Sequence, residues 1–154
     1  MSSALRFGRQ IARSGLTVAV AESLTCGRIA SEIGAIPRAS DWFLGGVIAY
    51  DNEVKFGVLG VTRGPVVSRQ CAAEMAEGVA RLTGADLALA VTGVGGPAHA
   101  EDQPPGTVFI AASLHGRTVV EQRHFPGDLE GVLDATVDRA LDLALRLATR
   151  PLDA

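Results

Sequence analysis

Lysine is almost absent from this sequence. Of its 14 basic residues, 13 are arginines, and Lys55 is the single lysine. The only tyrosine, Tyr50, and the only tryptophan, Trp42, lie in the same short stretch as Lys55. Because arginine stays protonated in proteins whereas lysine can lose its proton, the lone lysine indicates a place where chemistry needs a free amine. The alternative is that its position has no meaning.

Other kinds of residue are also scarce, and each shortage excludes a class of protein. Two cysteines, Cys26 and Cys71, are too few for a disulfide framework or a four-cysteine zinc site. The 3 histidines follow no metal-binding spacing. No apolar run approaches the roughly 18 residues of a membrane helix. A net charge of −3 supplies no basic field for nucleic acid. We therefore expect no bound metal ion, no association with a membrane and no nucleic-acid partner.

The length of 154 residues fits one domain, covering 1–154, with a hydrophobic core of its own. Three arginines precede a short apolar stretch at residues 16–21, as in a secretory leader. That stretch has only about six apolar residues, fewer than such leaders use. We therefore expect a cytoplasmic protein.

Helical and strand-like patterns alternate along the chain. Helical spacing covers residues 3–14, 25–35, 52–59, 69–83 and 128–148, and apolar strand-like runs cover 16–21, 45–50, 86–91, 107–114 and 118–125. The last two runs read as a hairpin. This order predicts an α/β fold of three layers, α/β/α, around a mixed, mostly parallel sheet.

Three polar or glycine-rich segments each follow an expected strand at its carboxyl end. They cover residues 22–27, 50–52 and 92–97. In open α/β sheets, ligands bind beyond the carboxyl ends of the strands. If these three strands are parallel, the three segments share one edge of the sheet and form the expected site.

The first segment, Glu-Ser-Leu-Thr-Cys-Gly, runs from a strand straight into a helix, and it leaves three interpretations open. In the first, Ser23 is a nucleophile exposed above the sheet, and unpaired N–H groups of the first helical turn bind an anion. In the second, Ser23 or Thr25 is only the N-cap of the helix. In the third, Cys26, a thiol beside a helix N-terminus, is the nucleophile.

At these residues the chain resembles the CinA C-terminal domain family, whose free-standing members include nicotinamide-nucleotide amidases. The matching segments are residues 21–25 (Ala-Glu-Ser-Leu-Thr), 42–55, 66–68 (Val-Val-Ser), 92–97 (Thr-Gly-Val-Gly-Gly-Pro) and 105–108 (Pro-Gly-Thr-Val). They occur in the family's order and span most of residues 5–145.

The resemblance implies hydrolysis of the carboxamide of nicotinamide mononucleotide to nicotinic acid mononucleotide and ammonia, a step of pyridine nucleotide salvage. The family's catalytic serine, lysine and tyrosine match Ser23, Lys55 and Tyr50. Neutral Lys55 would take the Ser23 proton, directly or through Tyr50, and backbone N–H groups would stabilise the oxyanion. We expect no cofactor and a homo-oligomer. The residues expected to bind the substrate are Thr25, Gly27, Asn52, Thr92, Gly93, Gly95 and Gly96.

The sequence also departs from the family pattern. Cys26 stands where the family usually has glycine, and Leu129 and Leu133 stand where it commonly has arginines suited to phosphate. Arg28 and Arg123 are candidate substitutes. These departures leave an alternative open: a nucleotide-binding member of the family with impaired catalysis or a shifted substrate.

Overall fold

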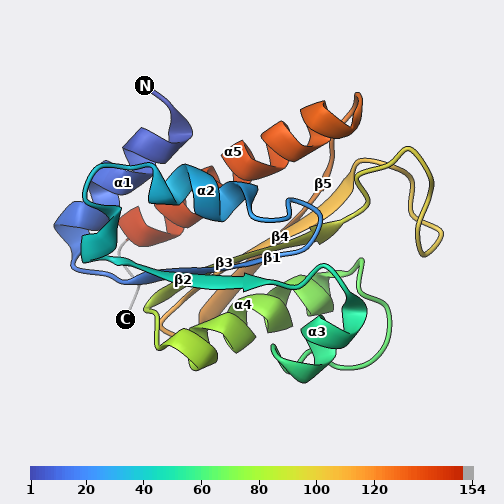
Figure 1. The fold of residues 1–154 in the computed structure, drawn as a ribbon, viewed down its shortest axis with the longest axis horizontal. Coiled ribbons are helices and arrows are strands. Elements are labelled where there is room, and N and C mark those ends of the chain that lie inside the picture. Colours follow the sequence, from blue (N-terminus) through green and yellow to red (C-terminus); the bar gives the residue numbers. More distant parts are fainter. Residues whose placement is uncertain (151–154) are drawn as a thin grey trace.

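The computed structural model describes residues 1–150, and its elements follow the expected order (Figure 1). The helices are α1 (Ser3–Ser14), α2 (Arg28–Gly34), α3 (Asn52–Gly57), α4 (Arg69–Thr83) and α5 (Leu129–Thr149). The strands are β1 (Val18–Glu22), β2 (Phe43–Ile48), β3 (Leu87–Gly93), β4 (Thr107–Leu114) and β5 (Arg117–His124). A short 3-10 turn, η1 (Ala39–Asp41), was not expected from the sequence.

The strands form one mixed five-stranded sheet in the order β2-β1-β3-β4-β5. β1 pairs in parallel with both β2 and β3, whereas β4 is antiparallel to β3 and to β5. β5 therefore runs in the direction of the first three strands, and β4 alone runs against them. The expected mixed sheet, with most strands pointing one way, is confirmed.

Helices cover both faces of the sheet, which gives the expected three layers. Figure 1 shows α1, α2 and α5 on one face and α3 and α4 on the other. The alternation of large and small residues along the central strands separates the two faces. Val18, Val20 and Leu89 face the first layer, whereas Ala19 and Ala88 face the second. Because alanines occupy little space, α4 packs close to the sheet.

Several element boundaries differ from expectation by two or three residues, and packing explains two of these differences. The helix expected over 25–35 begins only at Arg28, because residues 23–27 form a turn of their own. The strand expected over 45–50 covers 43–48, because Val18 at the start of β1 pairs with Phe43. Gly46 is required in this strand, since a Cβ there would lie 1.9 Å from the carbonyl oxygen of Val20.

Two further properties concern residues 1–150 only. No helix in this range has the length and hydropathy needed to cross a bilayer. The same range holds no group of three His, Cys, Asp or Glu side chains that could bind a metal ion.

Candidate active site

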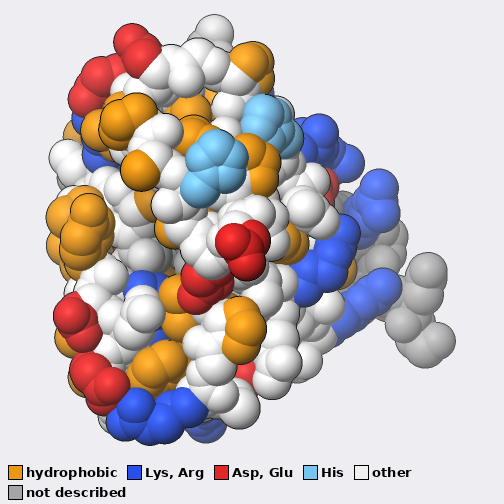
Figure 2. Space-filling model, turned by 90° about the vertical axis from the view of Figure 1, so that its right-hand side faces the viewer, with side chains coloured by type: hydrophobic (Ala, Val, Ile, Leu, Met, Phe, Trp, Pro, Cys, Tyr) orange, Lys and Arg blue, Asp and Glu red, His pale blue; other side chains and the backbone are white. Residues whose placement is uncertain are grey.

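Three segments meet at the edge of the sheet where β1, β2 and β3 end, as the sequence predicts. β1 lies between the other two strands, so the turn at 23–27 is flanked by the segments that follow β2 and β3. Backbone hydrogen bonds tie them together: Ala49 N donates to Glu22 O over 2.7 Å, and Ser23 N donates to Val91 O over 3.2 Å. We call this edge, with residues 22–27, 49–55 and 92–106, the rim. It faces the viewer in Figure 2.

Ser23 presents a hydroxyl that is not committed to any other group. The residue is 8% exposed, and its Oγ makes no hydrogen bond to another of residues 1–150. Its backbone is held on both sides, because its N–H bonds β3 and its carbonyl accepts from Cys26 N over 3.1 Å. Ser23 is therefore a fixed residue with a free nucleophilic oxygen.

The turn after Ser23 carries backbone donors without partners. Within residues 1–150, the N–H groups of Leu24, Thr25 and Gly27 make no hydrogen bond, whereas those of Cys26 and Arg28 are paired. Cys26 and Gly27 both have left-handed backbones, with φ of +47° and +97°. This conformation favours glycine, so the departure at Cys26 falls where a side chain costs energy. The exposed Cys26 thiol lies on the same turn.

The free donors expected of residues 22–27 are there, but the expectation that they form the first turn of the helix is wrong. The carboxylate of Glu22 accepts from Ile29 N and Ala30 N, each over 2.9 Å. Neither Ser23 nor Thr25 caps the helix, since the N-cap residue is Gly27, which has no side chain. A buried carboxylate occupies this helix N-terminus, so the free donors lie in the turn before it.

Lys55 is 1% exposed and lies on α3, as the last residue of the rim's second segment. Its Nζ donates to Tyr50 O over 3.2 Å and to Asn52 Oδ1 over 3.4 Å, and it forms no ion pair with another of residues 1–150. Burial lowers the pKa of the Lys55 amine below its usual 10.5, and Cys71, Asp51 and other acidic neighbours oppose that shift. An amine in this position gives up its proton more readily than an exposed lysine.

The second cysteine lies beside this amine. Burial raises the pKa of the Cys71 thiol to about 11, with Lys55 opposing the shift. The thiol is therefore neutral at pH 7. Cys71 belongs to the buried cluster between α4 and the sheet, so Lys55 has an apolar neighbour on this side.

Tyr50 meets Lys55 through its backbone, not its ring. The side chain is 68% exposed, and its phenol makes no hydrogen bond within residues 1–150. No direct hydrogen bond joins Ser23 to Lys55 within the same range. The three expected catalytic residues thus share the rim, but no hydrogen bond among the described residues joins the hydroxyl to the amine.

The residues expected to bind substrate at the end of β3 and just after it have packing roles of their own. The hydroxyl of Thr92 donates to Val66 O over 2.7 Å. A Cβ at Gly93 would lie 2.5 Å from Thr107 O, and one at Gly96 would lie 2.9 Å from Pro105 Cβ. Close packing thus requires these two glycines, whatever ligand the segment meets.

The start of α5 lies against the same segment. A Cβ on Gly95 would come within 2.6 Å of Leu129 Cδ1, and Leu129 is 46% exposed. Leu133 is buried in the next turn of α5. The leucine at 129 therefore stands at the rim itself, where it offers an apolar surface in place of a cation.

Both candidate substitutes for a phosphate-binding arginine are already in ion pairs. Arg28 donates to both oxygens of Glu130 over 2.8 Å and to Asp134 over 3.2 Å. Arg123 donates to Glu121 over 3.2 Å. In Figure 2 the larger groups of Lys and Arg lie along the right-hand and lower edges of this face, with acidic and histidine side chains nearer its middle.

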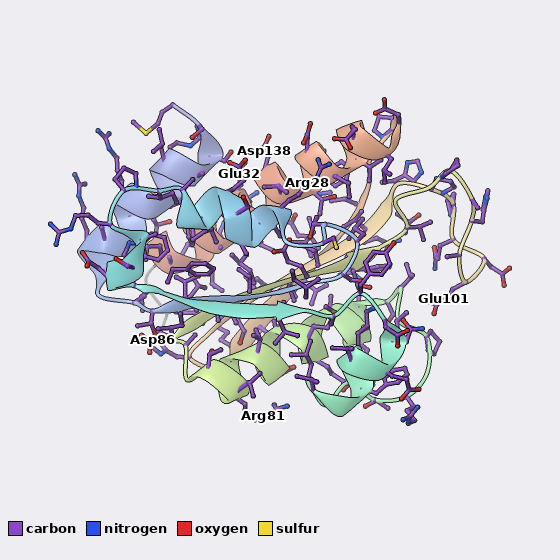
Figure 3. All side chains as sticks on the ribbon, viewed as in Figure 1. Arg28, Glu32, Arg81, Asp86, Glu101 and Asp138 are labelled. Carbon is purple, nitrogen blue, oxygen red and sulfur yellow. The ribbon has the colours of Figure 1, made fainter. Side chains whose placement is uncertain are left out.

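Sequence reasoning missed two carboxylates of the rim. Glu22 could have been identified from the sequence, because it is a charged residue at the end of an otherwise apolar strand. No sequence pattern pointed to Glu101, because its partners lie more than thirty residues away along the chain. Its carboxylate accepts from Val66 N and Val67 N over 2.7–3.1 Å. Figure 3 shows Glu101 extending from the segment after β3 on the side of α3. It ties that segment to the residues that precede α4.

Comparisons with known proteins agree with this architecture. The family model of the CinA C-terminal domain matches residues 2–148. A protein from Desulforudis audaxviator is 44% identical over 126 residues, covering 78% of this chain and 30% of its own length. A CinA-like protein from Geobacter metallireducens is 41% identical over 130 residues, covering 80% and 32%. The chain thus spans about a third of the length of these relatives.

Solved structures show the same fold over nearly the whole chain. A competence-damaged protein (CinA) superfamily protein from Klebsiella pneumoniae superposes with a TM-score of 0.92 at 31% identity, covering 95% of each chain. One from Escherichia coli superposes with a TM-score of 0.91 at 32% identity, covering 94% of this chain and 88% of its own. The chain belongs to the CinA C-terminal domain family.

Proposed function

We propose that this chain is an amidohydrolase that releases ammonia from the carboxamide of nicotinamide mononucleotide and leaves nicotinic acid mononucleotide. One observation carries the proposal: the only lysine, buried and outside any ion pair of residues 1–150, lies at the same rim as an uncommitted serine hydroxyl. Burial lowers the pKa of this amine. A lysine with a lowered pKa is a general base that can activate a serine.

The proposed reaction begins when neutral Lys55 takes the proton of Ser23 Oγ. The oxygen attacks the carboxamide carbon, and the negative charge that develops on the carboxamide oxygen is stabilised by the unpaired N–H groups of the turn, Thr25 and Gly27 among them. The ammonium of Lys55 returns the proton to the leaving nitrogen, and ammonia departs. Water then hydrolyses the ester on Ser23, with Lys55 again as the base.

Proton transfer between Ser23 and Lys55 needs a carrier or a rotation, since no direct hydrogen bond joins them. Tyr50 is the candidate carrier, because its backbone is already in contact with Lys55 and its phenol is free. Catalytic hydrogen bonds often form only when the substrate is bound.

A shifted substrate is the second candidate, and the apolar start of α5 favours it. Leu129 stands beside Gly95 at the rim, and Arg28 is neutralised by Glu130 and Asp134. A phosphate that loses a charge-assisted hydrogen bond loses about 1.5–3 kcal/mol of binding. An unphosphorylated carboxamide makes no such hydrogen bond and would lose no binding free energy.

A binding protein without catalysis is the remaining alternative. It would be indicated if pyridine nucleotides stabilise the wild-type protein but no product forms.

The deciding experiment measures ammonia release from nicotinamide mononucleotide and from its unphosphorylated riboside, from neutral to alkaline pH. Ser23→Ala is expected to lower kcat by about 10³-fold or more, and Lys55→Met by about 10²-fold or more. Ser40→Ala, an exposed serine away from the rim, is the matched control and keeps full activity. No ammonia from the wild type on either substrate would refute the amidase.

Tyr50→Phe removes the phenol hydroxyl and keeps the backbone carbonyl that Lys55 contacts, so it tests the hydroxyl alone. If the phenol carries the proton, kcat falls by about 10-fold or more while the hydrogen bond to residue 50 O remains. Unchanged kcat would assign the transfer to water.

A further inference from the structure

Glu22 is a fully buried carboxylate with no cation beside it. The residue is 0% exposed and forms no ion pair within residues 1–150. Its oxygens accept three hydrogen bonds instead, from Thr25 Oγ1 over 2.6 Å and from Ile29 N and Ala30 N over 2.9 Å each. Burying a charge is expensive unless such bonds compensate it, so a residue of this kind needs a reason.

The three bonds attach Glu22 to both halves of the segment that follows it. The N–H groups of Ile29 and Ala30 belong to the first turn of α2, where a negative charge is favoured by the helix dipole. The Thr25 hydroxyl lies in the middle of the turn between Ser23 and α2. One carboxylate therefore sets the position of the turn relative to the helix.

This turn has a backbone that needs such support. Cys26 and Gly27 are consecutive left-handed residues, a conformation that strains a residue with a side chain and persists only where its surroundings hold it. The same turn carries the unpaired N–H groups of Leu24, Thr25 and Gly27. Their direction depends on that backbone conformation.

We propose that Glu22 is a positioning residue of the active site: through Thr25 Oγ1 and the first turn of α2 it holds the N–H groups after Ser23 in the orientation that stabilises the oxyanion. This inference rests on the proposed amidase. Glu22 touches neither substrate nor nucleophile in this role, and it closes the N-terminus of α2 to any other anion.

The test removes the Thr25–Glu22 hydrogen bond without changing shape. Thr25→Val keeps the volume and loses the hydroxyl, whereas Thr25→Ser keeps the hydroxyl. We expect Thr25→Val to lower kcat by about 10- to 100-fold with KM within about twofold, because a small misplacement of donors acts on the transition state. Thr25→Ser is expected to restore kcat to within about threefold of the wild type.

The control is Thr83→Val, which removes a threonine hydroxyl bonded to Val79 O over 2.7 Å at the end of α4. Thr83 lies three residues before Asp86, which Figure 3 places at the opposite end of the sheet from Glu101. The Thr83 hydroxyl also accepts from Ala85 N over 3.2 Å, so Thr83→Val loses two hydrogen bonds where Thr25→Val loses one. Thr83→Val is therefore expected to lose at least as much thermal stability as Thr25→Val, but to keep its kcat. Equal kcat losses in the two would overturn the proposal.

A double-mutant cycle with Glu22→Gln separates action through Glu22 from direct contact of Thr25 with substrate. If Thr25 acts through Glu22, the double variant is no slower than the slower single variant; independent, multiplying effects would overturn the proposal. Should Glu22→Gln not fold, the Thr25 variants and their control decide. A wild type without ammonia release removes both the amidase and this role, whereas an active wild type with full kcat in Thr25→Val removes only the role of Glu22.

Discussion

Replacing Lys55 by methionine should make the protein more stable while it destroys activity. Methionine has a similar length and no charge, so it fills the same apolar site without the cost of a buried cation. Lys55 is 1% exposed, forms no ion pair within the described range, and holds only two long hydrogen bonds, of 3.2 and 3.4 Å.

The size of the gain follows from these opposing effects. Exchanging buried charged groups for apolar ones of similar volume is neutral or stabilising by about 1–4 kcal/mol, and leaving the Tyr50 carbonyl and the Asn52 amide oxygen without a donor costs roughly 1 kcal/mol each. The two losses together take about 2 kcal/mol from a gain of up to about 4 kcal/mol, so we expect a net gain of up to about 2 kcal/mol near neutral pH. For a chain of this length, a gain of about 2 kcal/mol raises Tm by about 4–8 °C.

The gain should also depend on pH, with a definite sign. Because burial lowers the pKa of Lys55 below the 10.5 of the unfolded chain, there is a pH window in which the unfolded state holds a proton that the folded state has lost. In this window the stability of the wild type rises with pH. The advantage of Lys55→Met is therefore largest below the window and shrinks as the pH approaches 10.5.

Urea unfolding at a series of pH values from 6 to 10 measures this difference directly. Arg9→Met, at an exposed arginine of α1, is the control and should stay within about 0.5 kcal/mol of the wild type at every pH. A Lys55→Met protein less stable than the wild type at pH 6, or a gain that does not change with pH, would refute the argument that the amine is held in a costly site.

Two further predictions concern the rim. At pH 7 the exposed thiol of Cys26 should react at once with a thiol reagent. The thiol of Cys71 should react only on unfolding, because it is buried and its pKa is raised to about 11. Two fast thiols in the wild type, or one fast thiol in Cys26→Ser, would contradict this. Leu129→Arg should lower KM for nicotinamide mononucleotide by about 10-fold or more without changing KM for the riboside, because it adds a cation for the phosphate beside Gly95. Leu82→Arg, at an exposed leucine near the end of α4, is its control, and an equal effect on both substrates would show that Leu129 does not face the phosphate.

The order of elements and the composition of the rim were readable from the sequence. Apolar runs of strand length separated by helical spacing predicted every strand and every α-helix, since these patterns depend on neighbours a few residues apart. The lone lysine and the serine at a strand end identified two residues that the fold brings to the same edge. The chain order also sufficed for the mixed sheet.

Partners of charged groups were decided only by the tertiary structure. Arg28 was a candidate for phosphate, but it pairs with Glu130 and Asp134, more than 100 positions later. The sequence placed the free donors of residues 22–27 in the first turn of a helix, yet they lie in a turn before α2, and the carboxylate of Glu22 occupies the first turn of α2 itself. Local patterns determine which residues form a helix or strand, whereas the pairing and burial of a charge depend on which distant side chains the packed layers bring within reach.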